Sequence, residues 1–182
     1  QTFRFFPHKL TGEGMFMAVA MKAGKSNGRR RAPKAKRQAI IPVDKKSSEE
    51  LALWVENSAE MRFFAAGEML YGCRKEHYAD IEALSGVLSV IYSGVAMGQI
   101  FKGRLKPDGA LALYVGLRRE HVECRELNDE QAIQYLRKQD LEADLFAEGI
   151  NMVTNRGAAL GFVKRIGPRV NNMYPNSLRI LK

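Results

Sequence analysis

A basic segment, residues 23–46, constrains the possible folds of this chain more than any other part of it. Its many Lys and Arg residues stand mostly among Gly, Ser, Asn, Ala and Pro, and Asp44 is its only acid. Such a composition buries too little apolar surface to offset the entropy lost on ordering. The chain is therefore divided into a short apolar stretch, residues 1–22, and a longer part, residues 47–182, which must supply the core.

The short stretch before the basic segment has the pattern of a β-hairpin. Residues 3–6 and 15–21 are apolar runs, and Gly12-Glu13-Gly14 between them suits a turn because glycine accepts positive φ. Strands that are apolar on both faces are normally buried on both faces. We therefore expect this hairpin to be the end of a larger sheet, and the chain that opens at Gln1 to be a fragment. Natural processing at Gln1 is the alternative.

Short helices and short strands alternate after the basic segment. Two N-terminal signals have the spacing of a capping box, Ser47 with Glu50 and Asn128 with Gln131. We expect helices over residues 47–57, 76–84, 108–115 and 128–138. We expect hairpins from 61–65 with 69–73, 87–92 with 95–101 and 150–154 with 159–165, and single strands over 121–127 and 178–180.

These elements predict an α+β protein of four parts. Residues 1–22 would be terminal strands left from another domain, and 23–46 a basic linker. Residues 47–85 would form a small α/β subdomain, and 86–182 a small mixed β-barrel with short helices.

Glycines recur four residues apart at two of the expected hairpins. Gly94 and Gly98 form one pair, and Gly157 and Gly161 form the other. Glycine inside strands is typical of places where backbones approach closely, so we expect close contacts at both hairpins.

Charge and composition restrict the classes of function. No apolar run reaches the 18 residues of a membrane span, so no membrane partner is expected. Two cysteines in 182 residues make no disulfide framework, which favours a reducing, cytoplasmic setting. The net charge is +9, but residues 1–46 alone carry +10, and residues 151–182 hold six basic residues and no acid. Two such zones predict a polyanionic partner, most simply nucleic acid. The alternative is a solvated tail beside ordinary surface charge.

Residues 160–179 gather side chains that suit RNA. Cations can neutralise phosphates, asparagine amides can bond bases or sugar hydroxyls, and tyrosine can stack on a base. The candidate RNA-binding residues here are Lys164, Arg165, Arg169, Asn172, Tyr174 and Arg179. Those in the basic linker are Arg29, Arg30, Arg31, Lys34, Lys36 and Arg37. The alternatives are a Tyr174 packed in the core beside Pro175 and a linker that is only a solvated tether.

Metal and thiol chemistry find little support. Cys73, His77, His121 and Cys124 have the ligand count of a structural zinc, but the two halves are far apart and loosely spaced. A small buried thiol and surface histidines are the simpler interpretation, and nothing supplies the third group of a Cys–His hydrolase.

Two groups of residues, Pro7-His8-Lys9 with Gly12-Glu13-Gly14 near the start and a pattern from Gly161 to Arg179 near the end, resemble the C-terminal region of RNA cytosine-5 methyltransferases of the Nol/Nop/Sun family. Pro7-His8-Lys9 with Gly12-Glu13-Gly14 resembles the closing strands of their methyltransferase domain. The pattern of seven later positions looks like the end of the PUA-like module in the larger bacterial ribosomal RNA enzymes: Gly161, Lys164, Asn172, Tyr174, Pro175, Leu178 and Arg179. Family members usually have a second Lys near the position of Val170 or Asn171, and this chain has Arg169 instead.

The resemblance implies a docking role in an enzyme whose catalytic centre lies elsewhere. It implies a PUA-like barrel, structured RNA, specifically ribosomal RNA, as the partner, and no DNA. S-adenosylmethionine and the cysteine nucleophile are expected in the catalytic domain. Neither Cys73 nor Cys124 has the sequence setting of that nucleophile, so no catalytic residue and no cofactor site are assigned to this chain.

A second function class remains open from the sequence. The chain would then be a free-standing RNA-binding or ribosome-assembly protein without catalysis. A reading frame that continues upstream of Gln1 to a Pro-Cys-Ser site favours the methyltransferase, and a start codon just before Gln1 favours the free-standing protein.

Overall fold

The computed structural model describes residues 2–5, 15–18 and 40–181. The first two ranges are the antiparallel strands β1 (Thr2–Phe5) and β2 (Met15–Ala18), with Thr2 opposite Ala18 and Phe5 opposite Met15. This pairing confirms the N-terminal hairpin. Its Gly12-Glu13-Gly14 turn and the six candidate cations of the linker lie outside the described residues.

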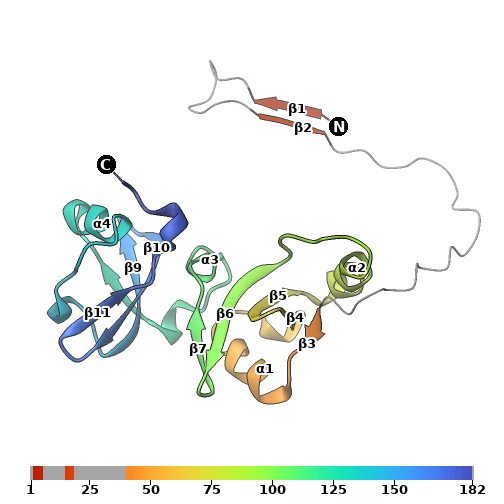
Figure 1. Cartoon of the computed structure of the whole chain (residues 1–182), viewed down its shortest axis with the longest axis horizontal. Helices are drawn as coiled ribbons and strands as arrows, with labels where there is room; N and C mark the ends of the chain where they lie inside the picture. Colours follow the sequence, from red (N-terminus) through yellow and green to blue (C-terminus); the bar gives the residue numbers. More distant parts are fainter. Residues whose placement is uncertain (1, 6–14, 19–39, 182) are drawn as a thin grey trace, which may run out of the picture. The chain divides into compact units, whose positions relative to one another are not determined.

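Residues 40–181 contain two sheets (Figure 1). The first has five antiparallel strands in sequential order: β3 (Ile41–Pro42), β4 (Met61–Ala66), β5 (Met69–Arg74), β6 (Val95–Phe101) and β7 (Arg104–Pro107). Its helices are α1 (Lys45–Ala52), the 3-10 helix η1 (Ser58–Glu60) and α2 (Lys75–Ser85). The hairpin of β4 and β5 and the helix α2 are confirmed.

The second sheet has the order β11-β10-β9-β8. Its strands are β8 (Glu123–Glu126), β9 (Gly149–Asn155), β10 (Ala158–Ile166) and β11 (Arg169–Asn172). Only β8 runs parallel to its neighbour, β9, because the connection between them contains α4 (Asp129–Leu136). Short helices complete this part: α3 (Gly109–Ala112), η2 (Arg119–His121), η3 (Ala143–Leu145) and η4 (Asn176–Leu178).

The predicted hairpin of residues 87–92 with 95–101 is wrong. Both edges of β6 are occupied, by β5 on one side and β7 on the other, so the apolar run 87–92 has no strand to pair with. The turn that follows β6 is Lys102-Gly103, and both residues have positive φ, 51° and 77°. Two left-handed residues are what a tight hairpin turn needs.

The predicted strand 178–180 is also wrong, and β11 takes its place beside β10. The chain turns at Gly167, whose φ is 57°, and returns as β11. The later residues form η4, and the Ile180 N–H donates to the carbonyl of Leu136 at the end of α4, 3.1 Å away. The last described residues thus bond to a helix and not to the sheet edge.

Side-chain caps set the starts of α1 and α4. Asn128 and Gln131 form the predicted capping box of α4. At α1 the cap is Asp44 and not Ser47, because the Asp44 carboxylate accepts hydrogen bonds from the Ser47 N–H (3.0 Å) and hydroxyl (2.6 Å). These bonds lower the pKa of Asp44.

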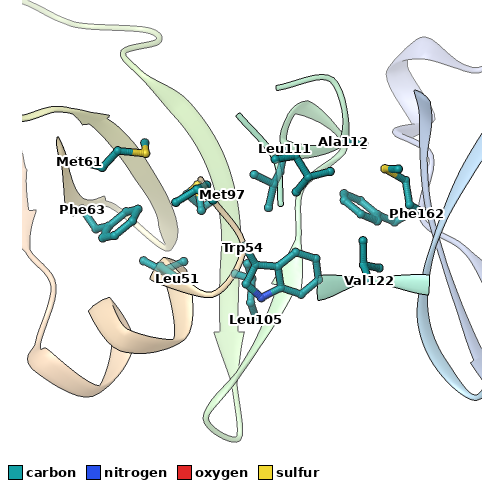
Figure 2. Packing of buried hydrophobic residues seen from close by; sticks show 13 residues of the cluster. Leu51, Trp54, Met61, Phe63, Met97, Leu105, Leu111, Ala112, Val122 and Phe162 are labelled. Atoms are coloured by element: carbon teal, nitrogen blue, oxygen red, sulfur yellow. The ribbon is translucent and has the colours of Figure 1, made fainter. Parts of the chain in front are cut away.

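One buried cluster joins the two sheets (Figure 2). It contains Leu51, Trp54, Met61, Phe63, Met97, Leu105, Leu111, Ala112, Val122 and Phe162 among others. The α+β class is confirmed. The small barrel is not, because the two sheets within residues 40–181 are open. The predicted division at residue 86 falls between β5 and β6, which pair directly in one sheet.

The recurring glycines do mark close contacts. A Cβ added at Gly94 would collide with the carbonyl oxygen of Gly72, and one at Gly98 with that of Lys106. Gly161 lies at a register shift in the pairing of β10 with β9, and a Cβ there would collide with the Tyr135 hydroxyl. Around Gly157 the space is open.

We predict that Gly161→Ala destabilises the fold by about 3 kcal/mol, because φ is 153° and the Tyr135 hydroxyl occupies the space of the new methyl group. Gly157→Ala is the matched control: φ is 75° in open space, which costs about 1 kcal/mol. Urea unfolding of both variants measures the difference. Equal losses would show that backbone strain alone acts at Gly161.

Candidate nucleic-acid interface

A groove of about 1540 Å³ lies between the two sheets. One side is lined by residues of α1, β6 and β7. The other is lined by residues of β9, β10, the end of β11 and the segment that follows β11. Trp54 also lines it, and its indole nitrogen is buried with no hydrogen-bond partner among the described residues. The groove therefore begins where the shared core ends.

The pattern of β10 explains how cations reach this groove. Side chains alternate between the two faces of a strand, so Phe162, Lys164 and Ile166 share one face. Phe162 is buried in the cluster that joins the sheets, whereas Lys164 and Ile166 are exposed and line the groove. The same strand face thus runs from the core into the groove.

Strand β11 adds to this wall through its register with β10. Asn171 lies opposite Lys164, and Arg169 lies opposite Ile166. Both are exposed and share the face of Lys164. The structure thus brings two predicted site residues, Lys164 and Arg169, to one face. Lys164 and Asn171 line the groove, and Arg169 lies on the same face outside the lining residues.

The hairpin of β6 and β7 supplies the cations of the other wall. Arg104 and Lys106 are exposed and line the groove. Neither belongs to an ion pair among the described residues. Neither cation was predicted as an RNA contact. The alternation of Arg104, Leu105 and Lys106 was the available signal, because it places both cations on the face opposite a buried leucine.

Four carboxylates also line the groove, and each is engaged within the protein. Glu50 accepts a hydrogen bond from the Leu105 N–H (2.9 Å), and Asp108 accepts one from the Ala110 N–H (2.9 Å). Glu148 accepts one from the Gly167 N–H (3.1 Å), and Glu68 accepts one from the Gln99 amide (3.4 Å). Among the described residues, none of these four carboxylates forms an ion pair with Lys164, Arg104 or Lys106.

Arg165 lies on the opposite face of β10, where its guanidinium forms hydrogen bonds within the protein. Its guanidinium donates to the carbonyl oxygens of Phe146 (2.6 Å) and Gly167 (3.0 Å), and it lies 3.8 Å from the Asp144 carboxylate. Only 27% of its side chain is exposed. Its donors face the protein and not the groove.

Asn172 and Tyr174 are likewise engaged internally. The Asn172 amide donates to the carbonyl of Tyr135 (2.8 Å) and accepts from the Tyr174 N–H (2.9 Å). The Tyr174 ring packs edge-on against Tyr135, with centroids 5.4 Å apart. Lys138 donates to the Tyr174 carbonyl (2.7 Å). Arg179 is exposed at the end of η4.

The four residues weighed for zinc do not come together. Cys73 is buried beside Phe64, and burial raises the pKa of its thiol. His77 is exposed beside Glu76, and His121 packs edge-on against Trp54 with ring centroids 5.0 Å apart. Across the described ranges, no three His, Cys, Asp or Glu side chains are placed to share a metal ion. Nor does any helix within them have the length and apolar character of a membrane span.

We predict that Arg165→Gln lowers the free energy of unfolding by about 2 kcal/mol, because the buried Phe146 carbonyl loses its donor. Lys164→Gln, one residue earlier on the exposed face, should change it by less than about 0.5 kcal/mol. Chemical denaturation of the two variants tests this contrast. If Arg165→Gln were as stable as the unmodified chain, Arg165 would have no structural role and would again be a candidate RNA contact.

Comparison with known proteins gives three matches. Residues 123–180 match the family model of the methyltransferase RsmF PUA domain. Ribosomal RNA small subunit methyltransferase F of Shewanella loihica is 26% identical over 180 residues, which are 95% of this chain and 36% of that protein. The protein of the same name in Aliivibrio fischeri is 38% identical over 55 residues, 30% of this chain and 12% of that protein.

The chain thus spans about a third of the length of the Shewanella protein. The segment matched by the family model contains β8 to β11, α4 and one wall of the groove. These findings confirm the resemblance drawn from the sequence: the chain is similar to the PUA-containing C-terminal region of ribosomal RNA methyltransferases of the Nol/Nop/Sun family.

Proposed function

We propose that this chain docks structured ribosomal RNA for an S-adenosylmethionine-dependent cytosine-5 methyltransferase. One observation carries the proposal: exposed cations of two separate sheets, Lys164 with Arg104 and Lys106, line the same groove. Phosphate contacts of this kind position a nucleic acid without reading its sequence. The two relatives named as small-subunit ribosomal RNA methyltransferases support ribosomal RNA as the ligand and the cytoplasm as the place.

In this proposal S-adenosylmethionine binds in the catalytic domain, and no site for it is assigned to this chain. A phosphate- or nucleoside-binding glycine loop stands before a helix of useful length, as in dinucleotide sites. Here Gly67, Gly103, Gly157 and Gly167 lie in hairpin turns, each between two strands. In this proposal the chain holds RNA, and no chemical step is assigned to its residues.

Docking has a plain physical mechanism. A rigid surface that fixes the RNA backbone lowers the entropy lost when the target base reaches a reactive group. Chemistry on carbon 5 of a base in a paired region also requires that base to leave its stack. A docking surface outside the catalytic centre supplies binding free energy that offsets this cost.

The proposal predicts a salt-dependent affinity that rests on exposed cations. Replacing Lys164 and Arg169 with Gln should weaken binding to a small-subunit ribosomal RNA fragment about tenfold and reduce the slope of log K against log salt by about 2. Fluorescence anisotropy with labelled RNA at several salt concentrations measures both quantities.

The control variant carries Lys75→Gln and Arg119→Gln. Both residues are exposed, neither belongs to β10 or β11, and the change in net charge is the same. An equal loss of affinity in the two double variants would contradict a localised site. Absence of binding by the unmodified chain at low salt would overturn the docking role itself.

A further inference from the structure

One aromatic side chain in the groove wall is exposed. Phe101 ends β6, lines the groove and has 68% of its surface accessible. Single exposed apolar residues are common on proteins, so exposure alone indicates nothing. The surroundings of the ring are what distinguish it.

The ring belongs to a face of the hairpin that is otherwise polar and basic. Phe101 pairs with Arg104 across the strands, and Gln99 pairs with Lys106. These four side chains share one face, while Leu105 on the other face is buried in the core. The amine of Lys102 lies 5.5 Å from the centre of the Phe101 ring. The aromatic ring thus lies on the same hairpin as three cations, Lys102, Arg104 and Lys106.

The hairpin that carries this face is held firmly. The Leu105 N–H donates to the Glu50 carboxylate of α1, 2.9 Å away, and the Leu105 side chain is 3% exposed. Both residues of the turn, Lys102 and Gly103, have the left-handed backbone conformation. A Cβ added at Gly103 would meet only the end of the Lys46 side chain, 3.9 Å away. The ring is therefore presented from a fixed backbone.

We propose that Phe101 is a stacking platform for one unpaired RNA base, with Arg104 and Lys106 on the adjoining phosphates. Aromatic rings bind bases through their π-faces, and neighbouring cations neutralise the backbone. A base within an undisturbed duplex has both faces covered by its neighbours, so it cannot use this site. The RNA recognised in the groove therefore carries a bulged or looped nucleotide beside a structured region.

This inference rests on the proposed function and deepens it. Phe101, Arg104 and Lys106 lie outside residues 123–180, so the matched PUA segment does not include this site. The inference adds a base contact on the five-stranded sheet to the phosphate contacts already proposed there.

The test compares two RNA hairpins that differ by a single bulged 2-aminopurine. The full chain should bind the bulged hairpin about tenfold more tightly than the fully paired one, and stacking on Phe101 should quench the 2-aminopurine fluorescence. Phe101→Ala should remove both the preference and the quenching, and Phe101→Trp should retain them. Val115→Ala is the control, since Val115 is 97% exposed and does not line the groove.

The outcomes separate the two proposals. If Phe101→Ala keeps the preference while the Lys164 and Arg169 replacements still weaken binding, the stacking site is wrong and the docking role stands. If the unmodified chain binds neither hairpin, the docking role fails as well. Circular dichroism of Phe101→Ala establishes that a lost preference is not lost folding, and the Phe101→Trp variant gives an independent readout.

Discussion

The edge-to-face contact between Trp54 and Phe162 fixes how the two sheets of residues 40–181 meet. Trp54 follows α1 on the side of the five-stranded sheet, and Phe162 belongs to β10; their ring centroids are 6.0 Å apart. Both rings are almost fully buried. A backbone bond from the Arg118 N–H to the Trp54 carbonyl (2.9 Å) ties the same region to the chain that leads into the second sheet. Because the groove walls belong to these two sheets, its width depends on this core.

The register of β10 decides which cations are available in the groove. Lys164 lies on the face of Phe162, and Arg165 lies on the other face with its guanidinium bound to the Phe146 carbonyl. A shift of one residue would exchange their positions. That register is set at the irregularity between Ala159 and Gly161, where Gly161 makes room for the Tyr135 hydroxyl. Gly161, which does not line the groove, thus helps to determine which side chains of β10 face it.

Local signals in the sequence were sufficient for the elements that local forces determine. The Asn128 capping box and the hairpin of β9 and β10 depend on residues close together in the chain, and both were predicted. The run 87–92 looks like a strand by composition, but whether a strand forms depends on a free neighbouring edge, which is a property of the whole sheet. The short strand β11 has one apolar residue, Val170, and its pairing comes from the turn at Gly167.

The candidate site shows the same limit more sharply. In the sequence, Lys164 and Arg165 are adjacent cations that suit RNA equally well. The structure distinguishes them, because the alternation of β10 directs Lys164 to the groove and Arg165 to the carbonyl of Phe146. Arg104 and Lys106 carried no signal of their own as RNA contacts, because the strand that faces them across the groove lies about 60 residues further along the chain.

Under the proposed docking role, the two walls of the groove determine which parts of the chain contribute RNA affinity. A surface built from two sheets around one shared core is pre-organised, so its cations lose little freedom when they bind. Contacts made at once from both walls reinforce each other, because the first fixes the RNA near the second. Residues 123–180 contain only one of these walls. Under the proposed docking role, the five-stranded sheet belongs to the RNA-binding surface, and the core around Trp54 and Phe162 holds the two walls of the groove together.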